Sequence, residues 1–276
     1  MTRRPLLPWA LLLPAALAIA LFLIAPLADT FSATFATAAG PFAPYQRFFA
    51  GAFNQQVLLR TLRIAALTTL IAVLLGFPAA YVIAKARASL KSILIIAAIF
   101  PLLTGTVVRS FAWIVILGRE GLINRTLATF GFTDGPVALL YTETAVVIGL
   151  VYLFSPLMIL ALVGVLENIE GDLLRAAASL GAGPVGVFRQ VVLPLAVPGL
   201  IVGAVLVFTG SFTAYTTPQL LGGEKQTVMA TLLYRRAMVS LDWVAASTVA
   251  AVMVVVTVAV VLGLGRVARR LNPAAG

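Results

Sequence analysis

The residue types that could carry out chemistry are few in this chain of 276 residues, because it contains neither histidine nor cysteine. This composition excludes disulfides, thiolate nucleophiles, the usual general base of hydrolases and nearly all zinc, copper or haem ligation. A Gly-x-Gly-Asp segment, typical of membrane aspartyl proteases, is also missing. We therefore expect a protein without catalytic residues and without a bound metal.

One glycine-rich segment has the form of a dinucleotide-binding fingerprint. Gly181, Gly183 and Gly186 fit the pattern Gly-x-Gly-x-x-Gly. The fingerprint requires a preceding β-strand and a βαβ unit, neither of which the flanking sequence provides. The chain also lacks a Gly-x-x-x-x-Gly-Lys-Ser/Thr loop for ATP phosphates. We expect it to bind no cofactor itself.

Two charged residues, Arg109 and Glu143, lie at the ends of apolar runs. A charge at the centre of a bilayer costs roughly 2.5–3.5 kcal/mol on insertion scales, and less near the interface. One interpretation is that the two residues form an ion pair that joins their helices. The alternative is that Arg109 extends its guanidinium to the lipid headgroups.

A run of hydroxyl-bearing residues occupies the end of a later apolar segment. Such side chains can offer hydrogen bonds to a passing solute without trapping it, or they can bond neighbouring helices. Both interpretations stay open for the five members of the run, which are Ser211, Thr213, Tyr215, Thr216 and Thr217.

The composition indicates that lipid, and not water, surrounds most of this chain. Hydrophobic residues make up 62% of the chain and charged residues 10%. Soluble domains are about 45–50% apolar and about 25% charged. The lysines and arginines lie between apolar runs, so the net charge of +10 indicates topology signals and contact with anionic lipid, and we expect no nucleic-acid partner.

Six segments are long and apolar enough to cross a bilayer as helices, which requires about 20 residues each. The sequence therefore predicts an all-α, multi-pass membrane protein. We read the first segment as an uncleaved anchor, because its apolar run is longer than the core of a signal peptide. The predicted spans are residues 6–27, 61–84, 92–117, 139–166, 196–217 and 244–265.

The number of positive charges alone does not decide on which side of the membrane the termini lie. With six spans both termini share a side, and that side carries ten of the 19 lysines and arginines. The other nine are spread over longer loops that contain more acidic residues. The density of positive charge favours termini in the cytoplasm.

The long loop on that side, residues 167–195, is expected to be structured. Leu173, Ala177 and Leu180 are spaced as one face of a helix that Asp172 begins. Gly181 and Gly183 can end that helix. Pro184 suits the first turn of a second short helix. The spacing predicts two short amphipathic helices joined by a sharp turn.

This loop resembles the Glu-Ala-Ala loop of ABC importer permeases. The resemblance rests on Ala176-Ala177-x-x-Leu180-Gly181-Ala182, on Val191-Val192-Leu193-Pro194 and on Pro198-Gly199. Arg175 takes the place of the family's glutamate, which would reverse any ion pair made there. The resemblance implies a coupling helix that docks on a cytoplasmic ATPase, formed by Asp172, Arg175, Ala176, Ala177, Leu180, Gly181, Ala182, Gly183, Phe188 and Pro194.

The resemblance also implies the fold and the assembly. The expected fold is the type I ABC importer transmembrane fold, with an N-terminal helix and periplasmic segment over residues 1–56 and a permease domain over 57–270. The expected partners are a second permease subunit of different sequence, two ATPase subunits that bind ATP and magnesium, and a periplasmic solute-binding protein. The expected location is the inner membrane, with both termini in the cytoplasm.

Further segments are similar to the spermidine/putrescine-type permeases. These are the run from Leu206 to Gly223, Val108-Arg109-x-x-Ala112-Trp113, and Gly121-Leu-Ile-Asn124. The similarity implies alternating access for a small polar solute such as a polyamine. A secondary transporter without an ATPase is the alternative. It would need membrane-centre acids or histidines and repeat symmetry, and the sequence shows neither.

Overall fold

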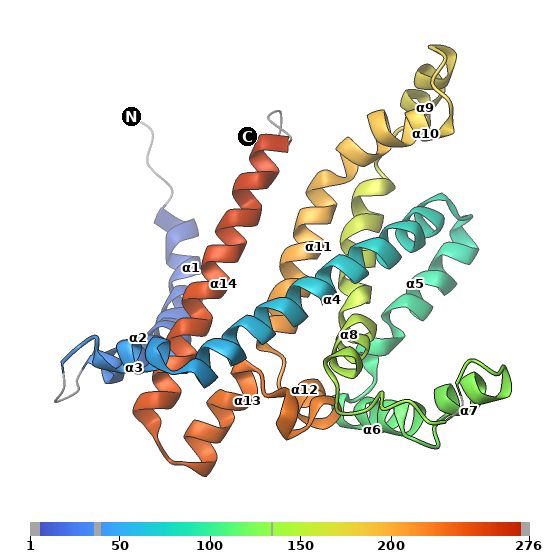
Figure 1. The fold of residues 1–276 in the computed structure, drawn as a ribbon. Helices are drawn as coiled ribbons and strands as arrows, with labels where there is room; N and C mark the ends of the chain where they lie inside the picture. The colour runs from blue at the N-terminus through green and yellow to red at the C-terminus, as the bar shows by residue number, and fades with distance from the viewer. Residues whose placement is uncertain (1–5, 36–39, 134, 272–276) are drawn as a thin grey trace. The chain divides into compact units, whose positions relative to one another are not determined.

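The computed structural model describes residues 6–35, 40–133 and 135–271, and every regular element in these ranges is helical (Figure 1). The described chain divides into two compact units. One contains the residues up to Gln55 together with Leu232–Val255, and the other contains Gln56–Thr231 together with the residues from Val256 on. The division at Gln55 lies next to the boundary expected at residue 57, but a late segment also belongs to the first unit.

The helices of the first unit come from both ends of the chain. Those at the N-terminal end are α1 (Leu6–Ile19), a π-helical turn (Ala20–Ile24), α2 (Ala25–Phe35) and α3 (Ala43–Ala50). Those from the later segment are the end of α13 (Met229–Tyr234), a π-helical turn (Arg235–Val239) and the start of α14 (Trp243–Leu271).

The second unit contains the helices that position the candidate site. They are most of α4 (Ala52–Lys85), α5 (Ala88–Leu103), α6 (Thr106–Leu117), α7 (Leu122–Thr129), α8 (Glu143–Leu166), α9 (Gly171–Ser179), α10 (Pro184–Val187), a π-helical turn (Phe188–Val192), α11 (Leu193–Thr213), α12 (Thr216–Gly222) and a 3-10 turn (Glu224–Gln226). Figure 1 shows α9 and α10 at one end of the α8–α11 pair, with α6, α7 and α12 toward its other end.

Among the described residues, five helices are long and apolar enough to cross a membrane, and a bent pair makes a sixth. This confirms the all-α fold with up to six spans. The predicted third span, residues 92–117, needs correction, because it is not one straight helix. Its two parts, Ala88–Leu103 and Thr106–Thr129, meet at an angle of 94°.

The bend has a local physical cause. Thr104 has extended backbone and Gly105 is also non-helical, so helical hydrogen bonding stops there and the last carbonyls of α5 lose their helical donors. Arg109 supplies donors instead. Its guanidinium donates to the carbonyl oxygens of Pro101 and Thr104, and the side chain is only 6% exposed.

The central helix pair of the second unit is α8 and α11. A Cβ atom added at Gly199 would lie 2.9 Å from the carbonyl oxygen of Ala161, and one at Gly203 would lie 2.5 Å from the sulfur of Met158. The two glycines therefore let the helices approach closely, as small residues do in membranes. Buried side chains of α4, α8 and α11 form one core around this contact.

The predicted fifth span, residues 196–217, has different limits in the structure. Helix α10, the π turn and α11 run on as one helix of 30 residues, Pro184–Thr213. The helix then stops, and Ala214 has extended backbone before α12 begins at Thr216. The second short helix of the long loop is therefore the beginning of the spanning helix and not a separate element.

Candidate functional site: the loop between α8 and α11

The first half of the loop is α9, which begins with Asp172 in its first turn. A carboxylate at this position interacts favourably with the positive end of the helix dipole. The same carboxylate pairs with Arg175 three residues later, where both side chains are almost fully exposed. The charge of Arg175, where the resemblance to permeases would place a glutamate, is thus balanced within the loop.

The turn after α9 depends on a glycine. Gly181 has φ +91°, a left-handed conformation that costs an L-residue roughly 1–2 kcal/mol. A Cβ atom there would meet nothing within 4 Å, so backbone geometry and not space requires the glycine. Gly183 is the residue before α10, and Pro184 lies in the first turn of that helix as predicted.

The second half of the loop is continuous with the membrane helix. The π turn Phe188–Val192 lies directly before Pro194. Proline cannot donate a backbone hydrogen bond, and its ring clashes with the carbonyl four residues earlier in a regular helix, so a wider turn relieves the crowding. The ring of Phe188 packs edge-on against Phe77 of α4, with centroids 5.4 Å apart.

The loop presents apolar side chains outward. Leu180 is 88% exposed and Val185 is 71% exposed, on either side of the Gly181 turn. The less exposed side chains of α9 are Leu174 and Ala177, and Leu174 packs against the core formed by α4, α8 and α11. The helix therefore has one anchored side, while the turn carries apolar surface of the kind that marks a protein interaction site.

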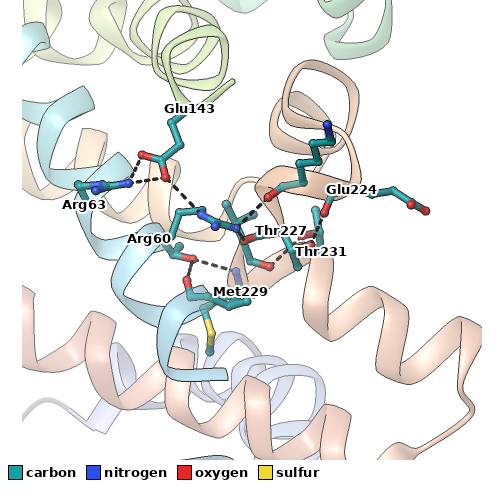
Figure 2. A network of polar contacts seen from close by, with 11 residues as sticks. Arg60, Arg63, Glu143, Glu224, Thr227, Met229 and Thr231 are labelled. Atoms are coloured by element: carbon teal, nitrogen blue, oxygen red, sulfur yellow. Dashed lines mark hydrogen bonds and ion pairs between the residues drawn. The ribbon is translucent and has the colours of Figure 1, made fainter. Parts of the chain in front are cut away.

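Apart from the loop, a network of polar contacts lies where α4 approaches the beginning of α8 (Figure 2). Glu143 pairs with both Arg60, at 3.3 Å, and Arg63. Arg60 also donates to the carbonyl oxygens of Lys225 and Thr227, and the hydroxyl of Thr61 accepts from the amide of Met229 at 2.9 Å. The network ties the segment after α12 to α4 and α8.

The predicted pair of Arg109 and Glu143 is corrected by these contacts. Glu143 is bonded to the two arginines of α4, while Arg109 is bonded to the carbonyls that end α5. Because the sharp bend at Gly105 brings Arg109 back over the end of its own span, its nearest acceptors are backbone oxygens. Arg109 therefore does not pair with Glu143, and its buried guanidinium donates to backbone oxygens of its own bent span.

The predicted hydroxyl run extends across the break between α11 and α12, with Tyr215 in the break itself. Ser211 and Thr217 are buried, Thr213 is exposed, and the other two members are half-buried. A Cβ atom at Gly149 of α8 would lie 2.7 Å from the methyl group of Thr217, so this threonine takes part in helix packing. A cavity of about 580 Å³ among α4, α5, α6 and α8 is lined mainly by apolar residues and by none of these five.

Arg60, Arg63 and Phe77 are structurally important residues that the sequence prediction missed. A usable signal existed for the arginines, because residues three apart lie on one face of a helix and can share a partner. Nothing in the local pattern pointed to Glu143, which lies 80 residues away from Arg63.

The comparison with protein families decides what kind of protein carries this loop. Residues 72–273 match the family described as the binding-protein-dependent transport system inner membrane component. The chain belongs to this family of ABC importer permeases. It is a multi-pass inner-membrane subunit without catalytic activity, and the family's ATPase partner binds ATP. A secondary transporter is thereby excluded.

Relatives within the permease family are named for different solutes. The chain is 32% identical to a spermidine/putrescine transport system permease from Haemophilus influenzae, over 79% of this chain and 76% of that one. It is 34% identical to a molybdenum transport system permease from Mycobacterium bovis, over 77% of this chain and 79% of that one.

A solved structure supports the fold. The permease fold of a bacterial alginate ABC transporter, solved in complex with an alginate-bound periplasmic protein, matches with a TM-score of 0.80 at 19% identity. The match covers 98% of this chain and 96% of that one. At this identity the likeness establishes the fold alone.

Proposed function

We propose that this permease imports a small polar solute of the polyamine class by alternating access, driven by two cytoplasmic ATPase subunits that bind ATP and magnesium. A second permease subunit of different sequence completes the membrane pathway, and a periplasmic binding protein delivers the solute. Both termini lie in the cytoplasm. The observation that carries the proposal is the structured loop with its exposed apolar turn at Gly181.

The loop has the properties that coupling requires. Its exposed side chains, Leu180 and Val185, offer apolar surface to an ATPase groove. Its second half continues into the spanning helix, so force on the turn acts directly on α11. In this proposal nucleotide-driven closure of the ATPases displaces the loop and changes access to the pathway.

The test is Gly181→Val in the assembled transporter. A β-branched residue does not tolerate φ +91°, so the turn must change shape. We expect at least a tenfold loss of ATPase subunit co-purifying with the permease, and a similar loss of solute uptake.

Gly186→Ala is the matched control, because it alters the same loop where φ is not left-handed and the added Cβ meets only the Ala182 Cβ, at 3.4 Å. It should leave both readouts within about twofold of the unchanged protein. Full ATPase association and uptake in Gly181→Val would refute the coupling role.

The polyamine class is supported by several spermidine/putrescine permeases among the relatives. The molybdenum permease at similar identity makes an oxyanion the competing class. Uptake of labelled spermidine by the assembled transporter, inhibited by unlabelled putrescine and unaffected by molybdate, is the expected result. The reverse pattern of inhibition would reject the polyamine class.

Within the chain we propose that Thr213, Tyr215 and Thr216 face the solute pathway. They flank the break between α11 and α12 and are exposed or half-buried, unlike Ser211 and Thr217. A helix break leaves backbone carbonyls without helical donors. Carbonyl and hydroxyl oxygens together suit a solute that carries ammonium groups.

A further inference from the structure

The first unit contains a basic cavity to which the proposed function assigns no role. Its volume is about 550 Å³, within the range of about 300–1,000 Å³ typical of small-molecule pockets. Arg47 of α3 and Arg236 of the π turn before α14 both line it. Phe48, Val244 and Val249 contribute apolar wall.

The two guanidinium groups are available to a ligand. Within the described residues, neither has an ion pair or a side-chain hydrogen bond, whereas Arg60, Arg63 and Arg109 all have partners. Asp242, the acidic residue of the lining, accepts a hydrogen bond from the amide of Ala245 at 3.0 Å and so caps α14. The lining therefore carries an excess of positive charge.

The position of the cavity indicates the depth at which its ligand lies. Asn54 belongs to the first turn of α4, and Val244 and Ala245 belong to the first turn of α14, and both helices are membrane spans. Trp243, which lies between the lining residues Asp242 and Val244 in the sequence, is 59% exposed. Exposed tryptophans at the ends of membrane spans mark the headgroup layer. The first turn of the long helix α14 adds the positive end of its dipole.

We propose that this cavity binds a phosphate group carried by an apolar body, as in the headgroup of an anionic phospholipid. Two arginines can hold phosphate oxygens through paired N–H donors, and basic pockets between membrane helices are known to accept lipid headgroups. The apolar wall of Phe48, Val244 and Val249 then contacts the glycerol and the first methylenes. The proposal does not depend on the transported solute or on the orientation of the chain.

The test uses the full chain purified in detergent and native mass spectrometry with added phosphatidylglycerol. The double variant Arg47→Gln/Arg236→Gln is expected to bind this lipid at least tenfold more weakly than the unchanged chain. The control Arg119→Gln/Arg125→Gln removes the same charge from exposed positions outside the cavity and is expected to bind unchanged. Arg236→Lys keeps the charge and should lose affinity only partly, which guards against misfolding of the double variant.

Competition with inorganic phosphate distinguishes a lipid headgroup from free phosphate as the source of the bound phosphate group. If millimolar phosphate fails to displace phosphatidylglycerol, the site is a lipid site; if it displaces the lipid, a free phosphate is the natural ligand. Equal lipid affinity in the two double variants would overturn the proposal. The proposal would also be overturned if Arg47→Gln/Arg236→Gln bound lipid normally but no longer bound the periplasmic binding protein. The cavity would then be a protein-docking site.

Discussion

Glu143 joins α8 to α4 through two arginines. Its carboxylate serves Arg60 and Arg63 at once, and Arg60 carries the contact on to the carbonyls of Lys225 and Thr227 (Figure 2). Only 25% of the Glu143 side chain is exposed, so water replaces these contacts poorly. Removing the carboxylate leaves two guanidinium groups without their counter-charge.

We therefore expect Glu143→Gln to lower the free energy of unfolding by about 1.5–3 kcal/mol, the usual range for hydrogen bonds to charged groups. Thermal unfolding of the purified chain in detergent measures the change. Asp172→Asn is the comparison, because it breaks an ion pair whose side chains are 79% and 78% exposed, and exposed pairs contribute little. Equal stability of the two variants would show that the network does not contribute to the free energy of unfolding.

Individual residues were predicted well where the rule was local. Gly181 and Pro184 were assigned from turn and first-turn preferences, which depend on a few neighbouring residues. The partner of Glu143 was not predictable, because the two arginines meet it through the packing of α4 on α8. The acceptors of Arg109 were missed because they exist only once the span has bent.

At the scale of the helices, the sequence located the apolar segments but not their interruptions. Hydropathy cannot register a change of direction, so residues 92–117 read as one span although the chain turns by 94° within it. Similarly, the loop periodicity predicted a helix after Pro184 but not its continuation into α11. Such continuity depends on whether Pro194 breaks the helix or is accommodated by a π turn.

The α8–α11 contact gives a test at this scale. Gly199→Ala places a Cβ 2.9 Å from the carbonyl oxygen of Ala161, a backbone atom that cannot move aside. We expect a loss of about 1–3 kcal/mol in the free energy of unfolding, as for other overpacked cores. Gly263→Ala in α14 meets nothing within 4 Å and should leave stability unchanged or slightly raised. Thermal unfolding of both variants would contradict the packing argument if their midpoints agreed.

At the scale of the whole molecule, the family and the fold were predicted and confirmed, while the orientation stays a prediction. The chain has no cysteine, so single cysteines report their own surroundings. Arg87 lies between α4 and α5, and Phe132 follows α7; both are exposed and they lie on opposite sides of the predicted topology.

We expect a membrane-impermeant maleimide to label Phe132→Cys in intact spheroplasts and to label Arg87→Cys only after the membrane is permeabilised. Comparing the labelled fraction before and after permeabilisation gives the result for each variant. Labelling of Arg87→Cys in intact spheroplasts would place both termini outside the cytoplasm.

The unbroken helix from Pro184 to Thr213 has a mechanical consequence. At a rise of 1.5 Å per residue its 30 residues form a rod about 45 Å long. In the proposed coupling, the continuous helix lets a displacement beside Gly181 reach the break at Ala214 without an intervening loop. The π turn and Pro198 are the irregular points along this helix, and in that proposal they set how much of the displacement reaches its other end.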